Sequence, residues 1–279
     1  METVAVVGVG LIGASFALAL RRAGFSGRIV GVSSPKAIEA GLAIGAISEE
    51  ASLERAAETA DLIYLAQPVD RILQTLELLA SRVNSKCLIT DAGSTKAAIV
   101  GRATDLLPPD RFLGGHPLAG KEQRGAEAAD GLLFRDRPYV LTPSGAMTAS
   151  MNELQDWLRR IEARVVLMSA AEHDNVVALT SHLPQLLSTA ISITLAEQAN
   201  PGLHEIFGPG LLDMTRLAMS SPELWKSILD TNRNEILKAL SKLTNNIGVL
   251  AQRVEYGISV DELFATARKF ALDLRKAGH

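Results

Sequence analysis

Val4-Ala5-Val6-Val7-Gly8-Val9-Gly10-Leu11-Ile12-Gly13 is the stretch that decides the fold of this 279-residue chain. The apolar run predicts a buried strand, and the periodic stretch Leu11–Ala23 predicts a helix directly after it. Gly8 permits the tight turn between them, Gly10 lets the backbone approach a pyrophosphate, and Gly13 lets helix and strand pack closely. The helix N-terminus offers unpaired N–H groups to the phosphate, and Leu11 and Ile12 are expected beside it. The stretch therefore predicts a dinucleotide site in a βαβ unit.

The same region carries no charged residue from Thr3 to Leu20, a length that also suits a signal peptide or a membrane span. No basic segment precedes it, and glycines interrupt it at fixed spacing. Arg21 and Arg22 then end it without a small-residue cleavage pattern. We therefore expect a buried strand and helix in a cytoplasmic protein with no membrane partner.

The first half of the chain alternates short apolar runs with amphipathic stretches, a pattern typical of parallel βαβ units. It predicts a Rossmann-type, doubly wound α/β sheet with helices on both faces, spanning residues 1–168. The expected strands are Val4–Val9, Arg28–Val32, Leu62–Ala66, Leu88–Asp91, Arg111–Gly114, Tyr139–Thr142 and Arg164–Met168. The expected helices are Leu11–Ala23, Lys36–Gly45, Val69–Arg82, Lys96–Leu107 and Ala149–Glu162.

Strand signals stop after Met168, so residues 169–279 are expected to form an all-helical domain. Capping patterns mark its helices: Ser169 with Glu172 opens a helix to about Gln198, Ser221-Pro222-Glu223 opens one to about Glu255, and Ser259 with Glu262 opens one to about Lys276.

The long helix of this domain has apolar residues on more than one face: Leu237, Leu240, Leu243, Ile247 and Leu250. Helices of this kind need a partner, which predicts a homodimer built from residues 169–279. The alternative is that these helices pack only on the first domain of their own chain. Sedimentation or light scattering separates the two.

Composition excludes several classes of protein. Lys and Arg number 28 against 31 Asp and Glu, and aromatic residues make up only 4%, so a phosphate-tracking or base-stacking nucleic-acid binder is not expected. Cys87, the single cysteine, excludes an intramolecular disulfide and a thiolate metal cluster, and its apolar surroundings predict a buried, inert thiol. The histidines are scattered without a zinc spacing, so no metal site is expected.

Cofactor choice depends on the end of the second strand, where NAD sites usually carry an acidic residue. This chain has Ser33, Ser34 and Lys36 there instead. The hydroxyls can donate to a 2′-phosphate and the lysine can balance its charge, which favours NADP and leaves NAD possible. Gln67 and Pro68, directly after the third predicted strand, complete the expected cofactor contacts.

Two polar segments follow predicted strands and so should lie at the ligand edge of the sheet. Asp91-Ala-Gly-Ser94-Thr95-Lys96 suits either a ligand contact or a helix cap through Ser94 or Thr95. Gly114-Gly115-His116-Pro117 opens a histidine to a ligand. Because the pKa range of histidine suits proton transfer near neutral pH, His116 beside a nicotinamide is predicted to be a general base.

The helical half adds a candidate anion site. Arg216 lies in an otherwise apolar stretch with Asp213 one turn earlier, so the acid can hold the guanidinium while it binds a substrate carboxylate through two hydrogen bonds. His182, beside a helix proline, suits either the core or the site.

Taken together, these motifs resemble the prephenate/arogenate dehydrogenase family of tyrosine biosynthesis over nearly the whole chain. The shared motifs are the glycine loop, Asp-x-Gly-Ser-x-Lys at 91–96, Gly-Gly-His-Pro-x-x-Gly at 114–120, His-Asp at 173–174, Ser-His-Leu-Pro at 181–184, Asp-x-x-Thr-Arg at 213–216, and Trp225.

The resemblance implies oxidative decarboxylation of a cyclohexadienol that bears a ring carboxylate. It implies that His116 takes the proton of the ring hydroxyl while hydride leaves the same carbon, and that Ser94 holds this hydroxyl. It further implies that Arg216 binds the ring carboxylate and that Glu122 lines or gates the side-chain end of the pocket. His182, Gln185 and Asp213 are expected on the same substrate side.

Two segments depart from the family pattern. Gln185 stands where the family often has a second histidine, and Gly208–Leu212 stands where it often has Gly-Gly-Gly-Phe-Arg. An acidic Glu122 favours the ammonium group of arogenate while the adjacent Lys121 opposes it, so prephenate and arogenate both stay open. The chain leaves no room for a regulatory ACT module or a fused chorismate mutase, so any inhibition by tyrosine is expected to be competition at the active site.

Two rival functions share parts of this pattern. A β-hydroxyacid dehydrogenase or pyrroline-carboxylate reductase also joins a dinucleotide domain to helices, but it has no need of Gly-Gly-His-Pro with the late Asp-x-x-Thr-Arg. A non-enzymatic module that senses NADP(H) would keep the glycine loop without His116, Ser94 and Arg216.

Overall fold

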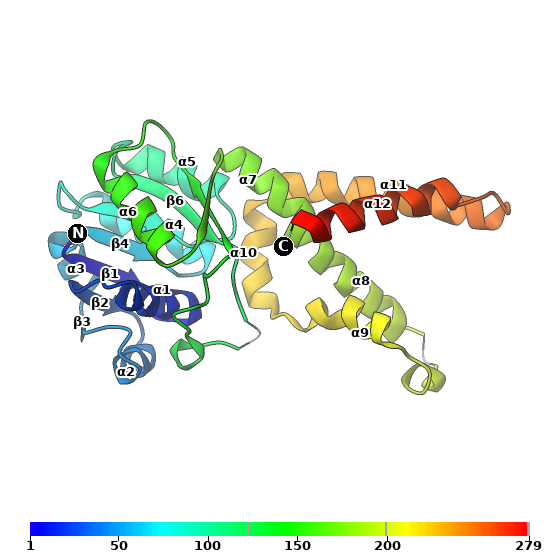
Figure 1. The fold of residues 1–279 in the computed structure, drawn as a ribbon, viewed down its shortest axis with the longest axis horizontal. Coiled ribbons are helices and arrows are strands. Elements are labelled where there is room, and N and C mark those ends of the chain that lie inside the picture. The colour runs from blue at the N-terminus through cyan, green and yellow to red at the C-terminus, as the bar shows by residue number, and fades with distance from the viewer. Residues whose placement is uncertain (122, 199, 278–279) are drawn as a thin grey trace. The chain divides into compact units, whose positions relative to one another are not determined.

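The computed structural model describes residues 1–121, 123–198 and 200–277 of the chain. The chain divides into two compact units, residues 1–233 and 234–279 (Figure 1). The expected boundary after residue 168 falls inside the first unit, directly after the last strand of the sheet. That boundary stays a prediction.

An eight-stranded sheet forms the centre of the first unit, in the order β3-β2-β1-β4-β5-β6-β7-β8. Strands β1 to β6 are mutually parallel, whereas β7 pairs antiparallel with β6, and β8 lies parallel to β7. The strands are β1 Thr3–Val7, β2 Arg28–Val32, β3 Glu49–Glu50, β4 Leu62–Leu65, β5 Leu88–Asp91, β6 Phe112–Pro117, β7 Pro138–Thr142 and β8 Arg164–Leu167.

The doubly wound class is confirmed, with two differences from the expected strands. Strands β7 and β8 run antiparallel to the other strands, a direction that apolar runs in the sequence do not indicate. Strand β3 was not expected, since it is two residues long and both are glutamates.

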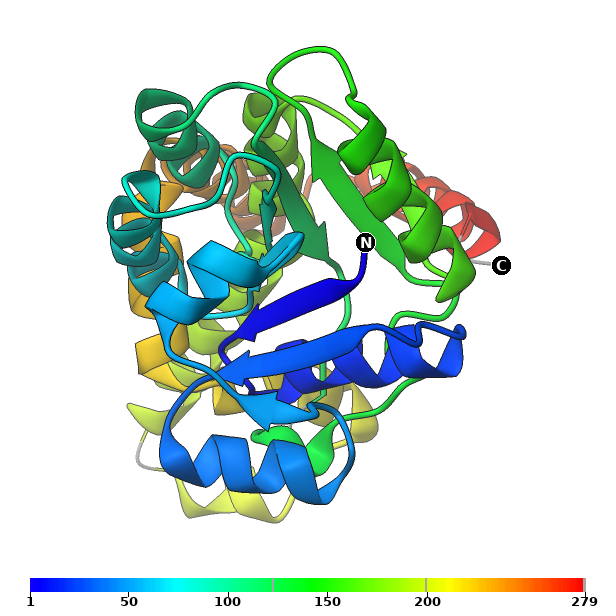
Figure 2. The same cartoon turned by 90° about the vertical axis from the view of Figure 1, so that its left-hand side faces the viewer.

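Helices cover both faces of the sheet (Figure 2), because successive strand residues point to opposite sides. Val4 and Val6 of β1 join one buried cluster, and Ala5 and Val7 join the other. On the first face lie α1 Leu11–Arg22, α2 Pro35–Ala43 and α6 Ala149–Arg160. On the second lie α3 Leu53–Thr59, α4 Val69–Ala80 and α5 Ala97–Leu106.

Helices begin near all three expected starts, but only Ser169 caps as predicted, because Ser221 makes no side-chain cap hydrogen bond and the last helix begins at Asp261, two residues after Ser259. The first two expected helices are each interrupted once. The Ser169 hydroxyl accepts a hydrogen bond from Glu172 N at 3.1 Å and opens the first of them. A π-helical turn separates α7 from α8, and Asn232 ends α10 where one continuous helix was expected. The elements are α7 Ala170–Val177, η2 Ala178–His182, α8 Leu183–Ala196, η3 Pro201–His204, α9 Pro209–Thr215, η4 Arg216–Met219 and α10 Pro222–Thr231.

Helix α11, Arg233–Glu255, leads into the second unit, where α12, Asp261–Ala277, follows. A turn at Gly257, whose φ is +63°, joins the two helices. Large apolar side chains remain exposed on both, among them Leu237, Val254, Phe264 and Phe270. These helices therefore present an apolar surface that a single chain leaves open to solvent.

One helical stretch, residues 170–196, is long and apolar enough to cross a membrane by length and composition, with mean hydropathy 1.3. This is a weak indication, because core helices of water-soluble proteins pass the same test. The stretch carries the buried polar residues His173, Asp174 and His182.

Candidate active site

The glycine loop lies where the carboxyl ends of several parallel strands meet. Val7, Val32, Leu65 and Asp91 stand in register as the last residues of β1, β2, β4 and β5. The segments that follow these residues therefore share one edge of the sheet, the position at which open α/β sheets bind ligands.

Each glycine of the loop has the environment its predicted role requires. Gly8 has φ +97°, and a Cβ there would lie 2.7 Å from the carbonyl oxygen of Ala66. A Cβ on Gly13 would lie 2.2 Å from the Gly8 oxygen, whereas nothing stands within 4 Å of a Cβ on Gly10. Helix α1 starts at Leu11 without a side-chain cap hydrogen bond, so its first N–H groups can bind a dinucleotide phosphate.

The candidate ribose residues lie beside this loop. Gly8 N donates to the Val32 oxygen at 2.9 Å, and Ser33 follows directly. Ser34 occupies the N-cap position of α2, but its hydroxyl makes no cap hydrogen bond. Ser34 and Lys36 are exposed and Ser33 is partly buried, so all three can be reached from solvent.

Gln67 and Pro68 also reach the cofactor edge. Gln67 Cγ would stand 3.1 Å from a Cβ on Gly8, and its amide oxygen accepts a hydrogen bond from Thr75 at 2.8 Å. Pro68 is the N-cap of α4.

A buried ion pair lies between the end of β5 and the start of α5. Asp91 and Lys96 are both fully buried, and Lys96 Nζ donates to Asp91 Oδ2. The same carboxylate accepts hydrogen bonds from Gly93 N at 2.8 Å and Gly115 N at 3.1 Å. Burial lowers the pKa of Lys96, and the negative charge of Asp91 opposes that shift. Asp91 thus ties the start of α5 to β6.

The cap of α5 comes from another helix. Asp174 of α7 accepts hydrogen bonds from Lys96 N at 2.7 Å and Ala97 N at 2.8 Å. The expectation that Ser94 or Thr95 caps this helix is wrong, because the carboxylate occupies that position. Thr95 instead contacts the hydroxyl of Thr231 at 2.8 Å, and Ser94 is partly buried at the same edge.

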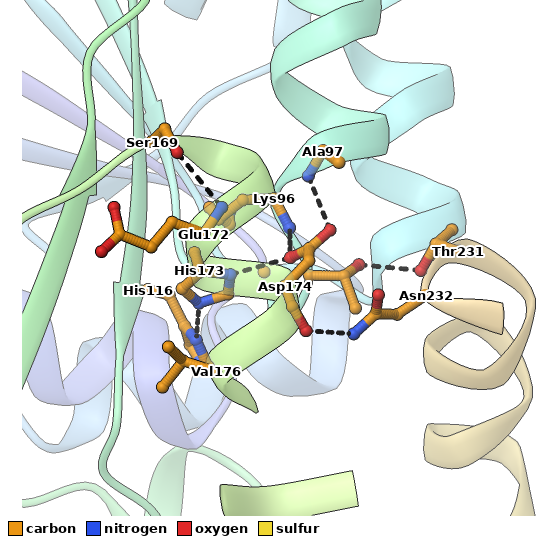
Figure 3. Close-up of polar contacts among 12 residues, drawn as sticks. Lys96, Ala97, His116, Ser169, Glu172, His173, Asp174, Val176, Thr231 and Asn232 are labelled. Atoms are coloured by element: carbon orange, nitrogen blue, oxygen red, sulfur yellow. Dashed lines mark hydrogen bonds and ion pairs between the residues drawn. The ribbon is translucent and has the colours of Figure 1, made fainter. Parts of the chain in front are cut away.

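His116 stands inside β6 rather than after it, because pairing with β7 extends this strand past the end of β5. Its Nδ1 lies 2.8 Å from Nε2 of His173, and Nδ1 of His173 lies 2.8 Å from Asp174 Oδ1 (Figure 3). Burial, with the neighbouring His173, Lys96 and His182, lowers the pKa of His116 well below its usual 6.5. His116 is therefore neutral at physiological pH, the form that a proton acceptor needs.

His182 lies on the π-helical turn and is 1% exposed. Its Nδ1 is 3.3 Å from Asn232 Nδ2, and its ring meets that of Trp225 edge-on. Burial lowers the pKa of His182 to about 4, against the opposing effect of Asp174. His182 is thus a core residue next to the site.

Gln185 supports the segment that carries Arg216. Its amide donates to the Leu217 oxygen at 2.8 Å, and Ser188 accepts a hydrogen bond from Ala218 N at 3.0 Å. Asp213 and Arg216 line one surface recess together with neighbouring residues of α8, α9 and η4. Asp213 and Arg216 therefore lie in the same recess.

Glu122 lies outside the described residues. Its neighbour Lys121 forms an ion pair with Asp130 at 2.9 Å.

The interactions of three residues were not foreseen from the sequence. Lys96, His173 and Asp174 lie within the sequence motifs described above, but the motifs do not indicate which residues they contact. The sequence features that could have indicated a role are a lysine at the start of an apolar helix and an adjacent His-Asp pair. Among residues 1–121, 123–198 and 200–277, no group of three or more His, Cys, Asp or Glu could hold a metal ion, and Cys87 is buried.

Comparison with known proteins covers both halves of the chain. Residues 16–167 match the family model described as prephenate dehydrogenase, nucleotide-binding domain, and residues 169–269 match prephenate dehydrogenase, dimerization domain. Prephenate dehydrogenase of Bacillus subtilis (strain 168) is 34% identical, over 99% of this chain and 78% of its own length.

Solved structures are similar to this chain over 99% of its length. Prephenate dehydrogenase from Aquifex aeolicus, in complex with hydroxyphenyl propionate and NAD+, has a TM-score of 0.90 at 29% identity and is covered over 98% of its length. Synechocystis arogenate dehydrogenase has a TM-score of 0.83 at 30% identity and is covered over 99%. With both halves matched, the chain belongs to the prephenate dehydrogenase family of nicotinamide-dependent oxidoreductases.

Proposed function

We propose that this chain catalyses oxidative decarboxylation of prephenate or arogenate, giving 4-hydroxyphenylpyruvate or tyrosine, and that it favours NADP over NAD. The observation that carries the proposal is His116. It is neutral and partly buried, and it lies on the same sheet edge as a loop shaped for a dinucleotide phosphate. A proton acceptor beside a nicotinamide site is what oxidation of an alcohol carbon requires.

His116 takes the proton of the ring hydroxyl as that carbon is oxidised. The bound nicotinamide supplies the hydride acceptor. The bond to the ring carboxylate then breaks, carbon dioxide leaves, and the bonding electrons complete the aromatic ring. His116 returns its proton to the ring oxygen at this stage, so the histidine ends neutral. Since aromatisation drives the step, the chain needs mainly orientation and one base.

The decisive experiment is an assay of the purified chain with prephenate and arogenate, each with NAD and NADP. We expect cofactor reduction to require one of these two substrates. No turnover with either substrate would contradict the proposed function. Turnover of a β-hydroxyacid instead would favour the rival enzyme class.

Cofactor preference tests the role of Ser33. We expect kcat/KM to be about tenfold higher with NADP than with NAD, because a charge-assisted hydrogen bond to the 2′-phosphate contributes about 1.5–3 kcal/mol. Ser33→Asp should reverse the preference, since a carboxylate repels that phosphate and binds the ribose hydroxyls. Ser26→Asp, on the loop before β2, is the matched control. A strong NAD preference in the unaltered chain would overturn the assignment.

Arg216 is proposed to bind the ring carboxylate. Arg216→Ala should raise the KM for substrate by about 10²-fold and change kcat only a few-fold, because it removes a bidentate charged contact formed on binding. Arg159→Ala is the control, since Arg159 is exposed on α6 and pairs with Asp156 on the same helix. An unchanged KM in the Arg216 variant would remove this residue from the substrate site.

We further propose that residues 1–168 hold the cofactor, while residues 169–279 hold the substrate and pair with a second copy. Exposed apolar residues on α11 and α12 support this assignment, as does the dimerization-domain match. Light scattering should give twice the mass of one chain. A monomer at micromolar concentration would contradict the dimer. We place the enzyme in the cytoplasm.

A further inference from the structure

Asp174, His173 and His116 form a row of three polar side chains that begins at the N-terminus of α5 and ends at His116 on β6 (Figure 3). Both links in the row are 2.8 Å long. His173 is fully buried and Asp174 is 2% exposed, so water does not compete for these contacts. The row therefore sets which nitrogen of each ring carries a proton.

The protonation pattern follows from Asp174. Its carboxylate accepts hydrogen bonds from Lys96 N and Ala97 N at the N-terminus of α5. An ionised carboxylate can only accept, so His173 donates to it from Nδ1. A neutral His173 then has an unprotonated Nε2, which can only accept in turn. His116 must donate from Nδ1, and this leaves its own Nε2 unprotonated.

We propose that His173 and Asp174 are positioning residues that hold His116 in the tautomer whose free base is Nε2. This inference rests on the proposed role of His116 as the proton acceptor. Without the row, His116 could carry its proton on Nε2 and would then present a donor, not a base, to the substrate hydroxyl.

The row also acts after proton transfer. When Nε2 of His116 takes the hydroxyl proton, the ring becomes a cation with its Nδ1–H already directed at His173. His173 in turn directs its Nδ1–H at the Asp174 carboxylate, so a negative charge lies at the end of the row. Burial and the neighbouring His173, Lys96 and His182 oppose a positive charge on His116, and the Asp174 carboxylate at the end of the row offsets part of that cost. Return of the proton on aromatisation restores the starting pattern.

A purely structural role is the competing explanation, because Asp174 also joins α7 to α5. Two variants of His173 separate the explanations. His173→Leu removes the acceptor for His116. His173→Gln places an amide oxygen near the former Nε2, so it can still accept from His116 but cannot relay charge. Ser169→Ala removes the N-cap of the same helix and leaves the row intact, which makes it the matched control for loss of stability in α7.

We expect kcat to fall about 10²-fold in His173→Leu and about tenfold in His173→Gln, with the KM for substrate and the Kd for cofactor unchanged. Ser169→Ala should lower the melting temperature without changing kcat. The proposal would be overturned if the two His173 variants lost kcat equally and if these losses matched the decreases in their melting temperatures. It would also be overturned by kcat values within about twofold of the unaltered enzyme.

The tautomer can be read directly without any substrate. In 15N-histidine-labelled enzyme without substrate, NMR should show a protonated Nδ1 and a bare Nε2 for His116, assigned by comparison with His116→Asn. His173→Gln should keep this pattern and His173→Leu should lose it. A proton on Nε2 of His116 in the unaltered enzyme would overturn the proposal even if His173→Leu fails to fold. Absence of turnover with prephenate and arogenate would refute the proposed function but would not change the NMR result, so failure of the two proposals can be distinguished.

Discussion

His116→Asn should lower kcat by about 10²-fold or more and leave the KM for substrate within a few-fold. The asparagine amide can hydrogen bond but cannot take a proton at neutral pH, so it removes the base without emptying the position. The loss appears in kcat because proton removal belongs to the transition state and not to substrate binding. Steady-state kinetics with saturating cofactor measures it.

The pH profile gives this variant a second readout. Because burial lowers the pKa of His116 well below 6.5, the unaltered enzyme should keep its activity as pH falls to that value. Activity should decline only at lower pH, where His116 gains a proton. His116→Asn should lack that inflection. His204→Asn is the matched control, since His204 is exposed on η3, and an active His116→Asn enzyme would refute the role of this base.

The cofactor loop could be predicted from the sequence because its requirements are local. Gly8 needs a positive φ and Gly13 needs close packing against the preceding strand, and both follow from the order strand, turn and helix. The position of His116 at the sheet edge also follows from that order. Its inclusion in β6 does not, because the extension depends on pairing with a strand more than twenty residues later.

Interactions between distant segments could not be predicted in the same way. Asp174 lies 78 residues after Lys96, yet it caps the helix that Lys96 begins. Asn232 ends α10, and its side-chain amide donates to the backbone oxygen of Asp174 at 2.8 Å, so the break in the expected helix coincides with a contact in the folded core. Hydrophobic periodicity describes one segment at a time and does not indicate such partners.

Asp91→Asn should have the largest effect on stability, with a loss of about 3–5 kcal/mol in the free energy of unfolding. Asp91 and Lys96 are both fully buried, so removing one charge leaves the other without compensation. Whichever way the asparagine side chain is turned, its NH2 group also lies against a hydrogen-bond donor. One carboxylate oxygen of Asp91 accepts from Gly115 N and the other accepts from Gly93 N and Lys96. Urea unfolding of the purified enzyme measures the loss.

A double-mutant cycle measures how much of this loss in stability comes from the Asp91–Lys96 ion pair itself. Lys96→Met in the Asp91→Asn background should recover part of the stability, because the unpaired buried charge is then gone. Glu77→Gln is the surface control, since its pairing with Arg102 at 2.8 Å is half exposed and should contribute about 0–1 kcal/mol. Equal losses for Asp91→Asn and Glu77→Gln would contradict the argument.

The pH dependence of stability tests the effect of the buried Lys96 charge independently. Burial already lowers the pKa of Lys96, and removal of Asp91 takes away the charge that opposes this shift. In Asp91→Asn the folded state then holds the lysine proton more weakly than the unfolded chain does, so stability rises with pH. The difference in the free energy of unfolding between Asp91→Asn and the unaltered enzyme should therefore narrow from neutral pH to about pH 9.5, where lysine in the unfolded chain begins to lose its proton. If this difference in free energy stays constant across the range, lost hydrogen bonds, rather than the charge of Lys96, cause the destabilisation.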